Sequence, residues 1–110
     1  MRGRSAAELL SLPVRSRGIQ LGRAVDALVD PASGRLLGFE VLCGDDAQRF
    51  LPLAVVELRA DEIAVGSALA LIDERDLGYY RSRAHSINDL GLADPWVDDQ
   101  GVVHEALSAA

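Results

Sequence analysis

The chain has 110 residues, 49% of them hydrophobic and 25% charged, which bounds it to one globular domain with at most a short appendage. Its net charge of −6 argues against broad phosphate binding, because nucleic acid would be repelled. Cys43 is the only cysteine, so an internal disulfide is excluded.

The first eleven residues predict a short helical turn that caps the domain. Ser5 and Glu8 have the spacing of a capping box, and Pro13 ends the turn because the residue before a proline is pushed out of the helical region. We expect no signal peptide, since Glu8 and Pro13 leave too short an apolar stretch between them. No stretch has the length of a membrane span, and the cytoplasm is the expected location.

The next part of the chain, residues 12–72, is punctuated like a set of short strands. Its apolar runs are Leu21–Asp30, Arg35–Cys43, Arg49–Leu58 and Ile63–Val65. Turn-forming residues separate them at Asp30–Gly34 and Gly44–Asp46. An α/β fold would need crossover helices, and the spacing leaves no room for them. The pattern therefore predicts an all-β fold, a small six-stranded antiparallel barrel that is partly open.

Apolar residues occupy both faces of the predicted strands, whereas a half-solvated antiparallel strand should alternate apolar with polar. We expect four leucines on the outer face: Leu36, Leu42, Leu51 and Leu53. They would form a sizeable exposed patch unless something covers them. Either the C-terminal segment or a second subunit would supply that cover, so these leucines are candidate protein-interface residues.

The remaining residues, 73–110, predict an acidic tail with helical and hairpin-like parts. Residues 73–84 favour a helix that presents Tyr79 and Tyr80, and Ser86 begins a second cap-like turn. Residues 96–103 read as a short hairpin that carries Trp96. The three aromatic residues either anchor a partner or hold the tail on its own barrel. The tail also echoes the beginning of the chain, since Ser5 and Ser86 open similar turns, either by chance or as the remnant of a second module.

No set of residues has the pattern of a catalytic, cofactor or metal site. His85 and His104 fit no short ligand motif, and Cys43 is followed by acidic residues that oppose a reactive thiolate. The one candidate anion-binding patch consists of three arginines near one end of the barrel: Arg15, Arg17 and Arg23.

The ordered pattern from Val14 to Val65 resembles the PRC-barrel family. The residues that carry the resemblance are Gly18–Arg23, Asp26, Val29–Pro31, Gly34–Val41, Arg49–Pro52 and Glu62–Val65. The resemblance implies a compact barrel of about six strands. Related barrels occur in the H subunit of photosynthetic reaction centres and in a ribosome maturation factor, where they bind partners and are not known as catalysts.

These observations together predict a non-catalytic protein-interaction or assembly module. The expected partner is another protein, or a second copy of the chain in a homodimer. The alternative, by analogy with the maturation factor, is an accessory role in RNA or ribosome assembly, which the acidic charge disfavours. No cofactor and no membrane insertion are expected.

Overall fold

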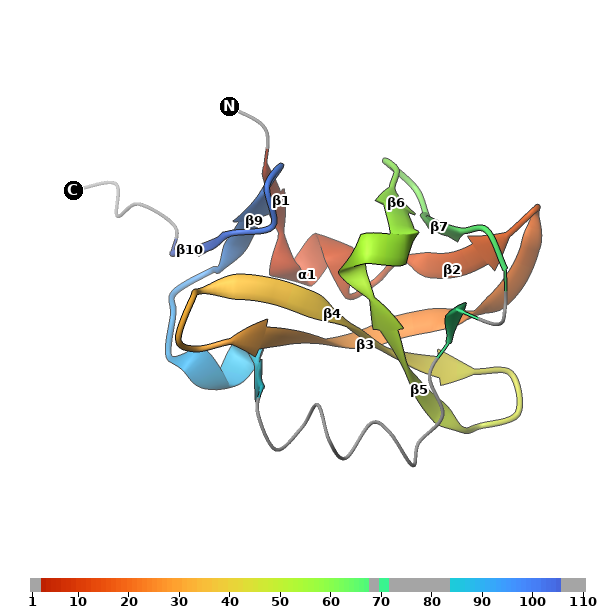
Figure 1. The fold of residues 1–110 in the computed structure, drawn as a ribbon, viewed down its shortest axis with the longest axis horizontal. Coiled ribbons are helices and arrows are strands. Elements are labelled where there is room, and N and C mark those ends of the chain that lie inside the picture. Colours follow the sequence, from red (N-terminus) through yellow and green to blue (C-terminus); the bar gives the residue numbers. More distant parts are fainter. Residues whose placement is uncertain (1–2, 68–69, 72–83, 106–110) are drawn as a thin grey trace.

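The structure is a computed structural model that describes residues 3–67, 70–71 and 84–105. The strands are β1 (Gly3–Ser5), β2 (Pro13–Ser16), β3 (Ile19–Asp30), β4 (Arg35–Cys43), β5 (Gln48–Pro52), β6 (Val56–Leu58), β7 (Ile63–Val65), β8 (His85–Ser86), β9 (Trp96–Asp98) and β10 (Val103–His104). The helical elements are α1 (Ala6–Leu9) and the 3-10 turns η1 (Leu53–Val55) and η3 (Ile87–Leu90). Figure 1 shows their arrangement.

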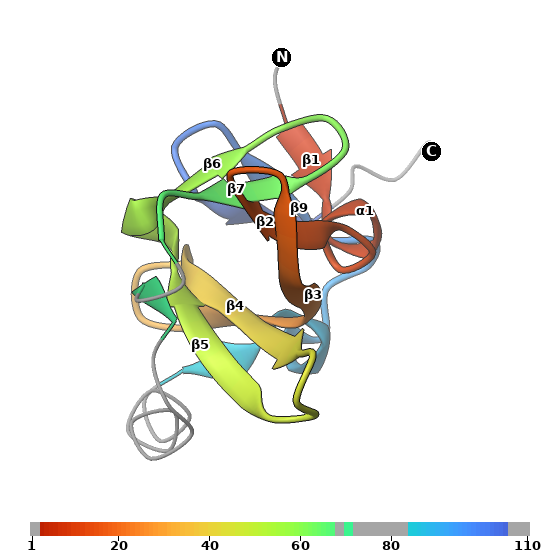
Figure 2. The same cartoon turned by 90° about the vertical axis from the view of Figure 1, so that its right-hand side faces the viewer.

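The larger sheet has the strand order β5-β4-β3-β2-β7-β6, with β8 paired to β3. It curls into a half-barrel, and Figure 2 shows its strands arranged around a common interior. The predicted all-β, partly open barrel is therefore confirmed. One feature differs from the expectation of an antiparallel barrel, because β2 and β7 pair in parallel. These two strands lie far apart in sequence, so no hairpin turn forces them to run in opposite directions.

Two glycines allow the sheet to curve tightly. A Cβ atom at Gly22 would collide with the carbonyl oxygen of Leu42, and one at Gly38 would collide with that of Leu51. Strand β3 also shifts register twice against β4, which bends it further. The backbones of β3, β4 and β5 thus approach more closely than side chains at these positions would permit.

Both predicted turns form. At the first, the N–H of Gly34 donates to the carbonyl of Asp30 at 2.8 Å, and Gly34 takes a φ of 71° that favours glycine. At the second, the N–H of Cys43 donates to the carbonyl of Ala47 at 2.9 Å, and Asp46 takes a φ of 65°. Asp is one of the few side chains that tolerate this left-handed conformation.

The predicted single run Arg49–Leu58 is wrong, because the chain breaks it at Pro52. Strand β5 ends there, η1 follows, and β6 begins at Val56. Proline has no N–H to donate and is tolerated on an edge strand, which β5 is. This break turns the chain from one edge of the half-barrel to the other.

A smaller sheet, of order β1-β9-β10, joins the beginning of the chain to the end of the described part. The caps predicted for both short helical elements are confirmed. The hydroxyl of Ser5 accepts the N–H of Glu8 at 3.1 Å, and that of Ser86 accepts the N–H of Asn88 at 3.3 Å. Chance and the remnant of a second module remain the two explanations for the similarity of these turns.

Segment 84–105 covers its own barrel, which was one of the two covers expected. Ala84 packs with Leu28 and Phe50, while Ile87 and Val97 are buried in the main core. Strand β8 also pairs with β3. The tail thus contributes to the same hydrophobic core as the barrel strands.

The expectation that Leu36 and Leu51 form an outer interface is wrong. Their side chains are only 4% and 0% exposed, because the curled sheet encloses them in the core. Leu42 and Leu53 are half-buried. The predicted helix over residues 73–84, with Tyr79 and Tyr80, lies outside the described residues except for Ala84.

Candidate functional site

A groove of about 650 Å³ lies between the smaller sheet and the edge of the half-barrel at β6. Its lining comes from β1, from η1 and β6, and from β9 with the turn that follows it: Gly3, Arg4, Leu53, Val56, Leu58, Val97, Asp98, Asp99, Gln100 and Gly101. We call it the β1–β6 groove. Strands β1 and β6, which give the groove its name, are labelled in Figure 1.

One wall of the groove is apolar. Val56 and Leu58 lie on the same face of β6 because alternate strand residues point the same way, and Leu53 adjoins them from η1. All three are half-buried. Glu57 falls between Val56 and Leu58 and is exposed, as expected for the opposite face. Apolar surface that is only half covered by its own chain can still gain stability from a bound partner.

The facing wall comes from the smaller sheet. Arg4 lies directly opposite Val97 in the β1–β9 pairing, so both side chains are on the face turned toward the barrel. Val97 is 2% exposed and belongs to the core. This wall is therefore fixed to the rest of the fold at its centre.

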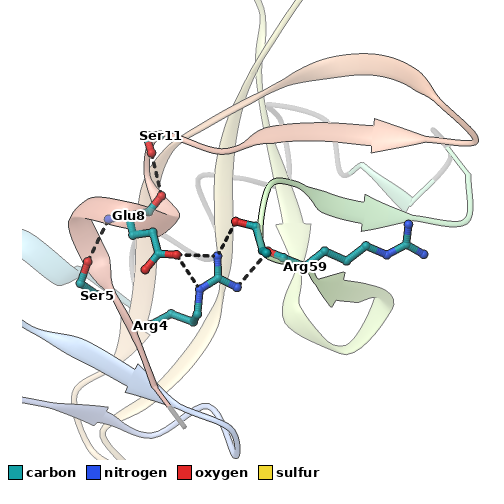
Figure 3. Close-up of polar contacts among 6 residues, drawn as sticks. Arg4, Ser5, Glu8, Ser11 and Arg59 are labelled. Atoms are coloured by element: carbon teal, nitrogen blue, oxygen red, sulfur yellow. Dashed lines mark hydrogen bonds and ion pairs between the residues drawn. The ribbon is translucent and has the colours of Figure 1, made fainter.

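Arg4 ties the two sides of the groove together, as Figure 3 shows. Its Nε donates to Oε1 of Glu8 at 3.0 Å, and its Nη1 donates to the carbonyl of Arg59 at 2.9 Å. Its Nη2 reaches the carbonyl of Ala60 at 3.4 Å. The planar guanidinium has several donors in a fixed geometry, which suits this triple bridge. The charge of Arg4 is compensated by Glu8. Arg4 therefore affects the width of the groove more than it affects the net charge of the groove.

The turn at the end of the groove is acidic. Asp98 Oδ1 accepts the N–H groups of Gln100 and Val102, both at 2.9 Å, and Oδ2 lies 2.8 Å from Nε2 of His104. The hydrogen bond with His104, and next that from Val102, lower the pKa of Asp98 from its ordinary value. Asp99 follows at the exposed tip of the turn. The carboxylate of Asp98 is thus engaged with its own turn and with His104, and Asp99 is the exposed carboxylate at this end of the groove.

Trp96 lies on the opposite face of the smaller sheet. Its ring stacks on His104, with centroids 4.4 Å apart and an interplanar angle of 21°. Gly3 also lies against the indole, so closely that a Cβ there would collide with it. Trp96 thus packs within its own sheet while staying half-buried, which supports the role of holding the tail in place.

The three arginines of the predicted anion patch are spread along one hairpin. Arg15 pairs with Glu62 at 3.6 Å. Arg17 lies in the turn between β2 and β3, whereas Arg23 is opposite Pro13 at the far end of β2. A strand advances about 3.3 Å per residue, so the strand separates these two charges. Arg23 lines a shallower hollow of about 380 Å³ together with Leu42 and Cys43.

The residues considered for chemistry do not converge. His85 and His104 lie on different strands, and Cys43 is buried. Among the residues that the structure describes, no group of three His, Cys, Asp or Glu side chains is placed to hold a metal ion. Asp98 and His104 resemble two members of a catalytic triad, but Ser5, the hydroxyl on the same sheet face, is across Trp96 and caps α1.

Comparison with known protein families finds no match, and comparison with curated proteins finds none either. The resemblance to PRC barrels therefore stays a prediction that rests on the residues quoted for it. No helix in the described ranges is both long and apolar enough to cross a membrane.

Sequence reasoning found one lining residue of the groove, Leu53, and missed the others. The spacing of Arg4 and Glu8 is a visible signal for an ion pair, since residues four apart meet on one side of a helical turn. No local signal shows that Arg4 also reaches Arg59, 55 positions away.

Proposed function

We propose that the protein is a non-catalytic interaction module that binds another protein through the β1–β6 groove. The observation that carries the proposal is the half-buried apolar wall of Leu53, Val56 and Leu58, left open beside an edge strand. The groove has a volume of about 650 Å³, which suits a few side chains of a partner. Burying such side chains against this wall provides affinity through the hydrophobic effect.

The non-catalytic part of the proposal is supported by the way the polar groups are used. Asp98 holds the β9–β10 turn and His104, and Arg4 bridges β1 to the β6–β7 turn. Groups that are engaged in structural hydrogen bonds in this way are poorly placed to transfer protons to a substrate.

A second copy of the chain is the alternative partner. Val55 is 47% exposed and adjoins the groove wall, so it extends the apolar surface outward. The predicted patch of four exposed leucines gives this alternative less support, because Leu36 and Leu51 are buried. A role with RNA is disfavoured by the net charge of −6 and by the pairing of four of the described arginines with acids: Arg4, Arg15, Arg49 and Arg59.

Site-specific photo-cross-linking tests the proposal in the full chain. A photoreactive residue replaces Val55, next to the groove, and in a matched protein it replaces Ile19, which is 68% exposed on the β2–β3 side. We expect a discrete protein adduct from position 55 and not from position 19. The captured protein is then purified, and its affinity is measured for the wild type, Leu58→Asp and Asp99→Arg.

Binding that weakens at least about tenfold in either variant, with unchanged thermal unfolding of that variant, supports the groove. The exposed Asp99 allows the test even if Leu58→Asp fails to fold. Equal adducts at both positions, or equal affinity for all three proteins, would overturn the proposal. Sedimentation of the purified chain alone distinguishes the two candidate partners. A dimer that forms in the wild type and is lost in the groove variants would identify a second copy as the partner.

A further inference from the structure

Strand β6 is the terminal strand of the larger sheet, and its outer edge is open. The N–H of Arg59 donates to the carbonyl of Glu62 at 2.9 Å, which makes this pair a hydrogen-bonded one. Hydrogen-bonded and non-hydrogen-bonded pairs alternate in antiparallel strands. With Glu57 opposite Ala64 and Leu58 opposite Ile63, the main-chain groups of Leu58 consequently point away from β7.

The main-chain N–H and carbonyl groups of both Val56 and Leu58, four groups in all, are thereby turned toward the outer edge. The N–H of Val56 is used by the carbonyl of Leu53, which closes η1. The carbonyl of Val56 and both main-chain groups of Leu58 make no hydrogen bond with any part of the chain that the structure describes. An edge of this kind is a template for a further strand.

The groove runs beside the same edge. Val56 and Leu58 present their side chains to the groove and their main-chain groups to the edge, so one extended segment would contact both. In strand addition, main-chain hydrogen bonds provide affinity, and pockets for alternate side chains provide specificity. A segment paired with β6 would direct every second side chain toward the apolar wall of the groove that Leu53 helps to form.

The charge of the groove favours a basic segment. Its charged lining residues are Arg4, Asp98 and Asp99; Arg4 is already paired with Glu8 and Asp98 with His104, which leaves the carboxylate of Asp99. Asp99 is exposed and has no ion pair with the described residues. The whole chain also carries a net charge of −6, which repels a second acidic copy and attracts a cationic partner.

We propose that the β1–β6 groove binds an extended, basic–apolar segment of a partner protein as an additional strand on β6. An apolar side chain of the segment packs against Leu53 and Leu58, and an arginine or lysine lies near Asp99. This inference rests on the proposed function and narrows the class of partner that the module accepts.

A short synthetic peptide in which valine alternates with arginine tests the proposal on the full chain. Two companion peptides isolate the two sources of affinity. One carries N-methyl groups on the amides that would pair with β6, and the other has glutamate in place of arginine. We expect the unmodified valine–arginine peptide to bind at least about tenfold more tightly than either companion. The N-methylated companion loses main-chain hydrogen bonds, and the glutamate companion loses the charge attraction.

Charge exchange gives the matched control. Asp99→Arg should weaken binding of the arginine peptide and strengthen binding of the glutamate peptide. Asp89→Arg makes the same change on η3, away from the groove, and should leave the ratio of the two affinities unchanged. Amide hydrogen exchange supplies a second readout. Bound peptide should slow exchange at Leu58 and leave Glu57 unchanged, since the alternation already pairs the Glu57 amide with β7.

The outcomes separate this inference from the proposed function. If the natural partner depends on Leu58 but the N-methylated peptide binds as well as its parent, the groove binds protein without adding a strand. Equal binding of the arginine and glutamate peptides would overturn the basic specificity. Protection of the Leu58 amide that grows with protein concentration, without peptide, would assign the edge to a second copy and overturn the inference.

Discussion

Trp96 and His104 stack their rings across neighbouring strands, with centroids 4.4 Å apart. The pair lies on the side of the smaller sheet turned away from the groove, and Oδ2 of Asp98 holds the imidazole from its edge at 2.8 Å. The stack therefore fixes β10 against β9, and through β9 it fixes the turn that ends the groove.

Removal of the imidazole should loosen this sheet. We expect His104→Ala to lower the free energy of unfolding by about 0.5–1.5 kcal/mol, the usual contribution of an aromatic pair. Trp96 is the only tryptophan, so its fluorescence reports the site directly, and its emission should shift to longer wavelength as the ring gains solvent. His85→Ala is the control, because His85 is exposed on β8 and should leave the emission unchanged.

Close strand approach at Gly38 makes this position intolerant of a side chain. A Cβ there would collide with the carbonyl of Leu51 and with the ring of Phe50, and both residues are buried, so neither can move aside easily. Gly38→Ala should destabilise the fold by about 1–3 kcal/mol through overpacking. A methyl group at Gly44 would meet no neighbouring atom, so Gly44→Ala should change stability by less than about 0.5 kcal/mol in chemical denaturation. Equal losses in the two variants would contradict the packing argument.

Asp45 should make the stability depend on acid pH. Its carboxylate is bound by Arg49 at 2.9 and 3.0 Å, and these hydrogen bonds, followed by that from the Ala47 N–H, lower its pKa from 3.8 to about 2. A group with a lowered folded-state pKa stabilises the fold above its unfolded pKa and loses that effect as the pH falls through the folded value. The stabilisation is thus complete above about pH 4 and lost toward about pH 2.

Denaturant titrations of wild type and Asp45→Asn across this range test the sign. The difference in unfolding free energy should be largest at pH 6 and should shrink as the pH falls from 4 to 2. Repeating the comparison with Arg49→Met identifies the cause, because the pH dependence should diminish when the guanidinium is removed. A difference that grows on acidification would show that another group is responsible.

Local signals explain why the sequence predicted much of the fold. Ser5 with Glu8, and Asp30 with Gly34, act over three or four residues, and each forms the cap or turn that its spacing indicates. The break after Pro52 and the 3-10 turn that follows it were missed, because Arg49–Leu58 was predicted as one run. A proline limits the strand without specifying which structure follows.

The leucines show where sequence patterning fails. Alternation reveals that both faces of a strand are apolar, but it cannot tell a face covered by distant parts of the same chain from one that awaits a partner. Leu36 and Leu51 are covered internally, while Leu53, taken from the same pattern, lines the groove. The groove itself was beyond prediction because it needs β1 to pair with β9, which lies near the other end of the chain.

Arg4 provides the sharpest test of how the groove is held open. Its side chain donates to the main-chain carbonyls of Arg59 and Ala60, so Arg4→Met should lower the free energy of unfolding by about 1.5 kcal/mol, the low end for hydrogen bonds from a charged group that is partly exposed. Arg59→Met is the matched control, because it keeps the main-chain carbonyl that Arg4 binds and removes only an exposed side chain. We expect that change to cost less than about 0.5 kcal/mol. If Arg59→Met proved as costly as Arg4→Met, the bridge from β1 to the β6–β7 turn would not be what stabilises this side of the protein.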